Sequence, residues 1–132
     1  MGNFHDLAQK LRTMQAQALD PSIAGAVTPL ALGEFVSAGA LVTKGTGIRL
    51  HRQPRHEELL MVLEGEADFR LGDETRRVRP GNLIFVPRNT VHGTVATHAE
   101  PLSFLSILAP QFDLARDVRW EDDAEPPRYQ LV

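Results

Sequence analysis

The chain has 132 residues, of which 42% are hydrophobic and 23% are charged, a composition typical of a single soluble folded domain. Its net charge of -3 at pH 7 argues against nucleic acid and acidic membranes as partners. The absence of cysteine excludes disulfides, thiolate metal sites and cysteine nucleophiles.

Residues 4–18 have the spacing of one amphipathic helix. Apolar residues recur three and four positions apart and therefore fall on a single stripe: Phe4, Leu7, Leu11, Met14 and Ala18. We predict that Asn3 caps this helix and that the stripe docks on the domain or on a partner subunit. The segment lacks the uninterrupted apolar core of a secretory signal, and no apolar run is long enough to span a bilayer. We therefore expect a cytoplasmic protein.

From about residue 29 the sequence changes to short segments rich in Val, Leu, Ile and Phe, separated by Gly, Pro and charged turns. This pattern predicts β-strands at 29–36, 39–43, 47–53, 58–64, 66–71, 75–79, 82–86, 91–97 and 102–109. Turns are expected at 64–66, 71–75 and 79–82. Many short strands at regular spacing indicate an all-β sandwich or barrel.

Two further segments flank the predicted strands. The tail carries the charged run EDDAEPPR, so we expect an ordered wrap near Trp120 followed by a loose end. We divide the chain into an N-terminal helical segment at 1–20, a barrel at 21–112 and a C-terminal extension at 113–132.

The stretch HRQPRHEE at 51–58 concentrates side chains that can bind a metal. Because side chains alternate across a strand, Arg49, His51 and Gln53 share one face. Glu58 begins the next apolar strand, and His92 lies in a later one. If these faces all point into one barrel, two imidazoles, one carboxylate and one amide oxygen converge. That donor set suits a divalent transition metal with open positions for water or substrate.

Two motifs within residues 45–96 resemble those of the cupin family. The family's first motif runs Gly, five residues, His-x-His, three or four residues, Glu, six residues, Gly. From its first His onward, its positions are held here by His51, Gln53, Glu58 and Gly65. Gln53 therefore stands where the second His belongs, and the leading glycine, Gly45, is off register.

The second motif of the family runs Gly, five residues, Pro-x-Gly, two residues, His, three residues, Asn. Gly81, Pro87 and His92 hold the expected spacing, with Asn89 in place of the second Gly and Ala96 in place of the final Asn. The resemblance implies an all-β jelly-roll barrel, which a short N-terminal α-helix would precede. It fixes no single activity, because cupins host many functions.

The resemblance also carries His51, Glu58 and His92 over as metal ligands, position by position. The ion would be a divalent transition metal: iron, manganese, nickel, zinc or copper. An amide oxygen binds such an ion less strongly than an imidazole, so either Gln53 weakens the site or His56 swings in as the missing imidazole. We favour Gln53 facing the metal and His56 at the rim, where His56 is also the candidate for moving protons in catalysis.

Three functions fit these residues. The first is a metal-dependent enzyme acting on a small organic acid or related metabolite, by dioxygenase, isomerase or decarboxylase chemistry. In that case Arg49 would bind an anionic group of the substrate. The second is a non-catalytic protein that binds a small molecule or sugar, with or without metal. The third is a mainly structural dimer.

A dimer is suggested by the strand at 58–64, which is apolar on both faces. Leu59, Met61 and Leu63 lie opposite Leu60 and Val62. A strand covered on both sides requires another layer, which would be the N-terminal helix or a second subunit. We expect a homodimer.

Overall fold

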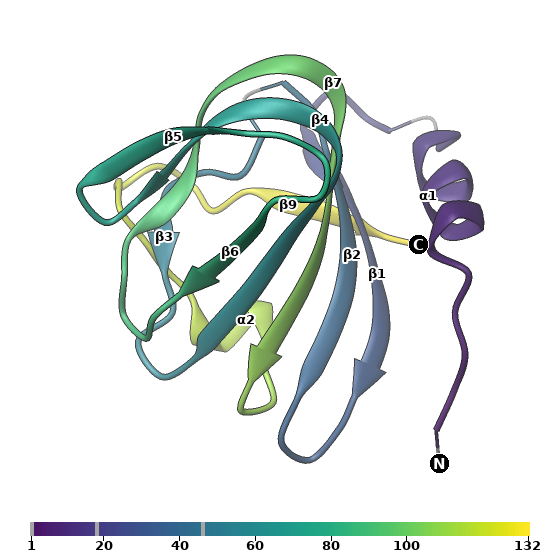
Figure 1. The fold of residues 1–132 in the computed structure, drawn as a ribbon, viewed down its shortest axis with the longest axis horizontal. Coiled ribbons are helices and arrows are strands. Elements are labelled where there is room, and N and C mark those ends of the chain that lie inside the picture. Colours follow the sequence, from purple (N-terminus) through teal and green to yellow (C-terminus); the bar gives the residue numbers. More distant parts are fainter. Residues whose placement is uncertain (1, 18, 46) are drawn as a thin grey trace.

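The computed structural model describes residues 2–17, 19–45 and 47–132. The elements in chain order are α1 (Leu7–Gln15), β1 (Ile23–Leu32), β2 (Ser37–Thr43), β3 (His51–Arg52), β4 (Glu57–Leu71), β5 (Glu74–Val78), β6 (Leu83–Val86), β7 (His92–Ala109), α2 (Leu114–Asp117), β8 (Arg119–Trp120) and β9 (Arg128–Leu131). Of the described helices, none is long and apolar enough to cross a membrane. The predicted all-β architecture with a short N-terminal α-helix is confirmed (Figure 1).

The strands form one bent sheet that folds over on itself. Its main path runs β5-β4-β7-β2-β1-β9, while β6 pairs with β4, and β3 joins β7 to β8. The long strands β4 and β7 pair antiparallel over almost their full length and make the spine of the molecule (Figure 1). His92 at the start of β7 pairs with His51 on β3 and with Leu71 at the far end of β4. Glu58, near the beginning of β4, therefore reaches His92 through its side chain and not through strand pairing.

The helix α1 is shorter than predicted. Its N-cap is Asp6, whose carboxylate accepts a hydrogen bond from the backbone N–H of Gln9 at 3.1 Å. The predicted cap, Asn3, instead donates to the Leu30 carbonyl at 3.3 Å, because residues 2–6 run extended along β1. Phe4 is therefore fully exposed rather than part of the buried stripe. The predicted last helical residue, Ala18, lies outside the described residues.

The turn predicted at 64–66 is wrong. β4 continues through this segment as one strand of 15 residues, with register shifts against β7 around Glu64 and Glu66. Gly65 has φ +85°, and a Cβ at this position would lie 2.5 Å from the Pro101 carbonyl oxygen. Only glycine therefore allows the two strands to approach so closely at this bulge. The predicted strands at 91–97 and 102–109 are likewise one continuous strand, β7.

Several predicted strand ends also differ from the structure. β1 begins at Ile23, and residues 33–36, predicted as strand, make the connection to β2. The strand predicted at 47–53 is reduced to β3. The predicted loose C-terminal end is wrong, because β9 pairs in parallel with β1 from Arg128 to Leu131. Backbone pairing to a distant strand, rather than local apolar pattern, orders this tail.

Two apolar clusters stabilise the fold. The first fills the barrel and includes Leu60, Val62 and Phe104. The second lies between α1 and the outer face of the sheet, where Leu11 and Met14 are buried and Leu63 packs against them. The helix therefore supplies part of the outer layer that β4 requires. It does not reach Leu59, whose exposed fraction is 40%.

Candidate functional site

Four of the predicted site residues come together at one end of the barrel. His51 on β3 is the direct antiparallel partner of His92 on β7. Their ring centroids are 4.2 Å apart. Glu58 lies next to the start of β4, and Gln53 directly follows β3. All four side chains are buried, as alternation along the strands predicts.

The two imidazoles are held by backbone carbonyls. His51 Nδ1 lies 2.8 Å from the Arg49 carbonyl oxygen, and His92 Nδ1 lies 2.9 Å from that of Thr90. A carbonyl only accepts hydrogen bonds, so each Nδ1 carries the proton. This fixes the ring orientation and directs both Nε2 atoms at the other polar side chains of the site. Metal-binding histidines are commonly oriented in this way.

Glu58 connects the other polar groups. Its Oε1 lies 3.0 Å from His92 Nε2, and its Oε2 accepts a hydrogen bond from Ser106 Oγ at 2.5 Å. The Gln53 amide lies between His51 Nε2, at 3.2 Å, and Glu58 Oε1, at 3.4 Å. With Nδ1 already protonated, His92 Nε2 and the Glu58 carboxylate attract each other only if they share a proton or a cation.

The electrostatics of the site favour a cation. Burial, reinforced by the charge of His92, lowers the pKa of His51 to about 4, so this imidazole is neutral at pH 7 and its Nε2 lone pair accepts a hydrogen bond from the Gln53 NH2 group. Burial alone would raise the pKa of Glu58. The hydrogen bonds from His92 and Ser106 and the charge of His92 outweigh it and hold that pKa below its usual value. The buried Glu58 carboxylate therefore needs a compensating positive charge, which either a protonated His92 or a bound cation supplies.

The same four side chains do not stand as a preformed metal centre. Within the described residues there is no group of three or more His, Cys, Asp or Glu side chains that could hold a metal ion. The Gln53 amide is inserted between His51 and Glu58 and bonds to both. Metal binding would therefore require this amide to turn, so that its oxygen replaces its NH2 group as the atom facing the site.

A cavity of about 260 Å³ opens at these side chains. Apart from the site residues and Ser37, its described lining is mainly aliphatic and aromatic, from β1, β2, β4, β7 and the C-terminal extension. The extension contributes Leu114, Val118, Trp120 and Tyr129, and Phe112 directly precedes it. Burial raises the pKa of Tyr129, so its hydroxyl stays neutral and can donate a hydrogen bond. Glu58 is the one acidic residue in the described lining, which includes no Lys or Arg.

The structure places the other two predicted site residues away from this cavity. Arg49 extends to the C-terminal extension, where its guanidinium contacts Asp122 at 3.2 Å and the Glu125 carbonyl oxygen at 2.8 Å. His56 is buried, with Nε2 2.9 Å from the Gln111 carbonyl oxygen. Neither residue is part of the described cavity lining. Of Gln53 and His56, it is Gln53 that the fold brings to His51.

Two contributors to the site were not predicted from the sequence. Ser106 reaches Glu58 only because β4 and β7 pair in a particular register, which no local pattern reveals. Asn89 has φ 62°, and its backbone N–H donates to the Gln53 backbone carbonyl at 2.8 Å. This turn therefore helps to hold Gln53 beside His51. Asparagine tolerates the left-handed region better than most residues. The sequence indicates this turn because Asn89 occupies a position that is glycine in the second family motif.

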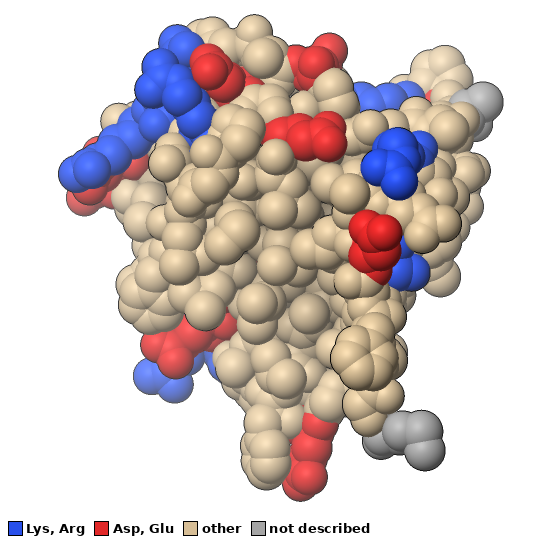
Figure 2. Space-filling model, turned by 45° about the vertical axis from the view of Figure 1, so that its right-hand side comes forward, with Lys and Arg blue, Asp and Glu red and all other residues tan. Residues whose placement is uncertain are grey.

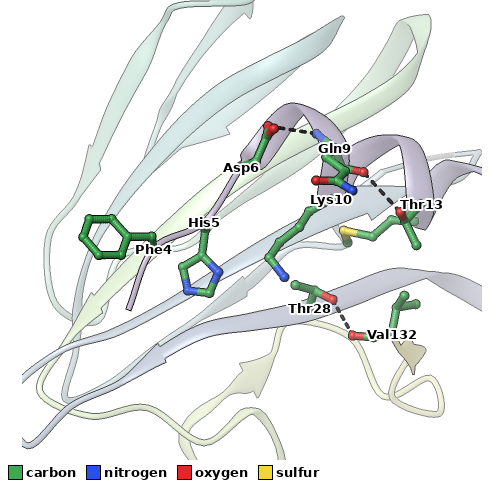
Figure 3. A pocket seen from close by; sticks show the side chains of 9 residues that line it. Phe4, His5, Asp6, Gln9, Lys10, Thr13, Thr28 and Val132 are labelled. Atoms are coloured by element: carbon green, nitrogen blue, oxygen red, sulfur yellow. Dashed lines mark hydrogen bonds between the residues drawn. The ribbon is translucent and has the colours of Figure 1, made fainter. Parts of the chain in front are cut away.

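A second hollow of about 400 Å³ lies at the surface between the start of α1 and β1 (Figure 3). Several of its polar side chains make structural hydrogen bonds. His5 Nε2 lies 2.6 Å from the Leu30 carbonyl oxygen, Asp6 caps the helix, and Thr28 bonds to the Val132 carbonyl oxygen. Buried ionisable groups converge instead at the barrel cavity.

The chain belongs to the cupin family, because the family's sequence profile, described as a cupin domain, matches residues 40–108. No curated protein matches the chain. Solved structures share the fold. KdgF from Halomonas sp. is 26% identical, with a TM-score of 0.62 over 74% of this chain and 86% of that one.

Two further solved structures are more distant in sequence. TT1209 from Thermus thermophilus is 24% identical, with a TM-score of 0.65 over 81% of this chain and 96% of that one. Pac13 of Streptomyces, described as a nucleoside dehydratase, is 18% identical, with a TM-score of 0.56 over 68% of this chain and 71% of that one. These similarities show the fold. The activity of this chain has to be inferred from its own residues.

Proposed function

We propose that this cupin is a metal-dependent enzyme that acts on a small organic acid or a related metabolite. The observation that carries the proposal is the convergence of His51, Gln53, Glu58 and His92 on one buried cavity. Two imidazoles and a carboxylate are the donor set of many mononuclear transition-metal centres, and they leave positions open for a substrate.

The spacing of the donor atoms supports a metal. His92 Nε2 and Glu58 Oε1 are 3.0 Å apart, close enough for both to reach one ion. His51 Nε2 faces the Gln53 NH2 group, and the amide would have to turn before its oxygen could join them. The ion would be iron, manganese, nickel, zinc or copper. Once bound, it would polarise substrate oxygens or, in the case of iron, activate dioxygen.

The protein's own groups would orient the reactants and exclude water. The Arg49 and Thr90 carbonyls hold the imidazoles, and Ser106 holds Glu58. The apolar walls would surround the body of the substrate. Proton transfer by His56 stays a prediction, and it requires His56 Nε2 to leave the Gln111 carbonyl.

The test is turnover by metal-loaded protein. The apoprotein is reconstituted separately with each of the five metals and mixed with a panel of small organic acids, in air and without oxygen. We expect consumption of at least one acid with one metal and none by the Glu58→Gln variant. Oxygen dependence would separate dioxygenase chemistry from isomerase or decarboxylase chemistry. Binding without consumption under every condition would contradict an enzymatic role.

One observation favours the alternative, a non-catalytic cupin that binds a small molecule or sugar. The imidazole proposed to move protons, that of His56, is outside the described cavity lining and bonded to Gln111. The lining then offers Glu58 and the two proposed imidazole ligands as its basic groups. A ligand that copurifies with the protein and is returned unchanged from it would support this alternative.

Replacement of Gln53 by histidine is expected to tighten metal binding. The substitution restores the imidazole of the family motif and replaces a weakly binding amide with a stronger ligand. We expect the dissociation constant for zinc or nickel to fall by at least about tenfold, which corresponds to about 1.4 kcal/mol. Calorimetric titration measures the change. Gln53→Asn, which shortens the amide, is the control and should not tighten binding.

We also propose that the protein forms a homodimer through the outer face of β4 and β6. Leu59, Leu83 and Phe85 have exposed fractions of 40%, 58% and 50%, and β4 pairs Leu59 directly with Phe85. Figure 2 shows a broad face whose centre carries no charged side chain, with the charged residues at its margins. A cluster of exposed apolar side chains on one sheet face commonly marks an interface.

The dimer predicts a specific effect of polar substitution. Leu59→Ser combined with Phe85→Ser should shift the mass in light scattering from dimer to monomer, because it removes apolar area from the centre of the interface. Leu131→Ser, which changes an exposed leucine on β9, is the control and should leave the mass unchanged. A wild-type protein that elutes at monomer mass would contradict the proposal.

A further inference from the structure

The C-terminal extension places Trp120, the sole tryptophan of the sequence, against the proposed metal site. β8 pairs antiparallel with β3, which sets Trp120 directly opposite His51. The ring centroids of the two residues are 5.3 Å apart, with an angle of 47° between the ring planes. Trp120 also lines the barrel cavity. A bulky side chain next to a residue that binds the metal limits which small molecules can approach that metal. Trp120 has this position beside His51.

Arg49 fixes the position of Trp120. Its guanidinium carbon lies 4.9 Å from the centroid of the Trp120 ring, within the range of a cation–π contact. The same group donates to the Glu125 carbonyl at 2.8 Å and pairs with Asp122 at 3.2 Å. Arg49 therefore contacts both the indole and the segment that follows it. A lysine could not reproduce this planar, multi-point contact.

The cavity that Trp120 helps to close accepts charge at one end only. The described lining beyond the polar site is mainly apolar and includes no Lys or Arg, and the volume is about 260 Å³. A ligand carboxylate would have the proposed metal as its partner. A second carboxylate on the same ligand would face the apolar side chains of Trp120 and Val118, with no Lys or Arg in the described lining to pair with it.

We propose that Trp120, positioned by Arg49, determines the selectivity of the site for small monocarboxylates with an apolar body and against dicarboxylates. This inference rests on the proposed function, since it names the acid class which that site would take. Arg49 acts here as a positioning residue rather than as the partner of a substrate anion.

The probes are pentanoate and glutarate, which have the same five-carbon chain and differ by one carboxylate. Their dissociation constants are measured by calorimetry with zinc-loaded and with zinc-free protein, and zinc content is determined separately for every variant. We expect the wild type to bind pentanoate at least about tenfold more tightly than glutarate, a difference of about 1.4 kcal/mol. Trp120→Ala should reduce this ratio toward one with zinc content unchanged, whereas Trp120→Phe should largely preserve it.

Arg49→Met tests the positioning role. It should lower the pentanoate-to-glutarate preference and shift Trp120 fluorescence to longer wavelength as the indole becomes more exposed, again with unchanged zinc content. Arg52→Met is the matched control, because Arg52 pairs with Glu121 of the same extension at 3.8 Å. Arg52→Met should change neither the pentanoate-to-glutarate preference nor the wavelength of Trp120 fluorescence.

Equal affinity for the two acids would overturn the inference, as would failure of pentanoate to bind or a preference that Trp120→Ala leaves intact. Absence of bound zinc in the wild type would instead contradict the proposed function, because the first carboxylate of either acid would then have no partner in the site.

Discussion

Replacement of His92 by alanine is expected to abolish stoichiometric metal binding. The substitution removes one of two imidazoles whose Nε2 atoms point into the site. It also leaves buried Glu58 Oε1 without its imidazole partner. Loss of a hydrogen-bond partner by a buried polar group costs about 1–3 kcal/mol, so we expect a clear decrease in the free energy of unfolding. Calorimetric metal titration and chemical denaturation measure the two effects.

Two further variants separate metal loss from misfolding. Glu58→Gln keeps the size of the side chain but removes the charge, so it should fold and still fail to bind metal. His98→Ala removes a partly exposed histidine that pairs with Asp68 at 2.9 Å on the outside of the sheet. Exposed pairs contribute little, so this variant should retain both metal and stability. Full metal binding by His92→Ala would contradict the assignment of this ligand.

Replacement of Gly65 by alanine should destabilise the fold strongly. The residue has φ +85°, which costs an L-amino acid about 1–2 kcal/mol. The added Cβ would also lie 2.5 Å from the Pro101 carbonyl oxygen and 2.7 Å from that of Ala99, so β4 and β7 would have to separate. Crowding of this kind adds about 1–3 kcal/mol. We expect a total loss of about 2–5 kcal/mol in chemical denaturation.

Gly81→Ala is the matched control for this effect. Gly81 has a similar φ of +90°, but a Cβ at that position would meet nothing within 4 Å. It should show the conformational cost alone. Equal losses in the two variants would mean that the close approach of β4 and β7 at Gly65 carries no energetic weight.

The sequence predicts which polar side chains meet in the site because the information that places them is local. The two-residue period of a strand places His51 and Gln53 on one face, and the motif spacing includes Glu58 and His92. All four meet in the structure. The structure adds the direct contact of Gln53 with both His51 and Glu58, which separates this chain from the family pattern.

The remaining features depend on partners that lie far along the chain. Arg49 shares the strand parity of His51, yet its guanidinium is held by residues 122–125 of the extension. A glycine between two glutamates is typical of a turn, and only the pairing with β7 makes Gly65 a bulge instead. The order of the C-terminal tail likewise comes from pairing with β1 and β3.

The central claim is that His51, Glu58 and His92, with the amide of Gln53, hold one metal ion. It is tested most directly by elemental analysis of untagged wild-type protein, purified without chelator and then reconstituted with each candidate metal. We predict close to one transition-metal ion per chain, retained through gel filtration. Protein that holds no metal after reconstitution would contradict the claim and would make the same side chains the polar wall of a small-molecule binding cavity.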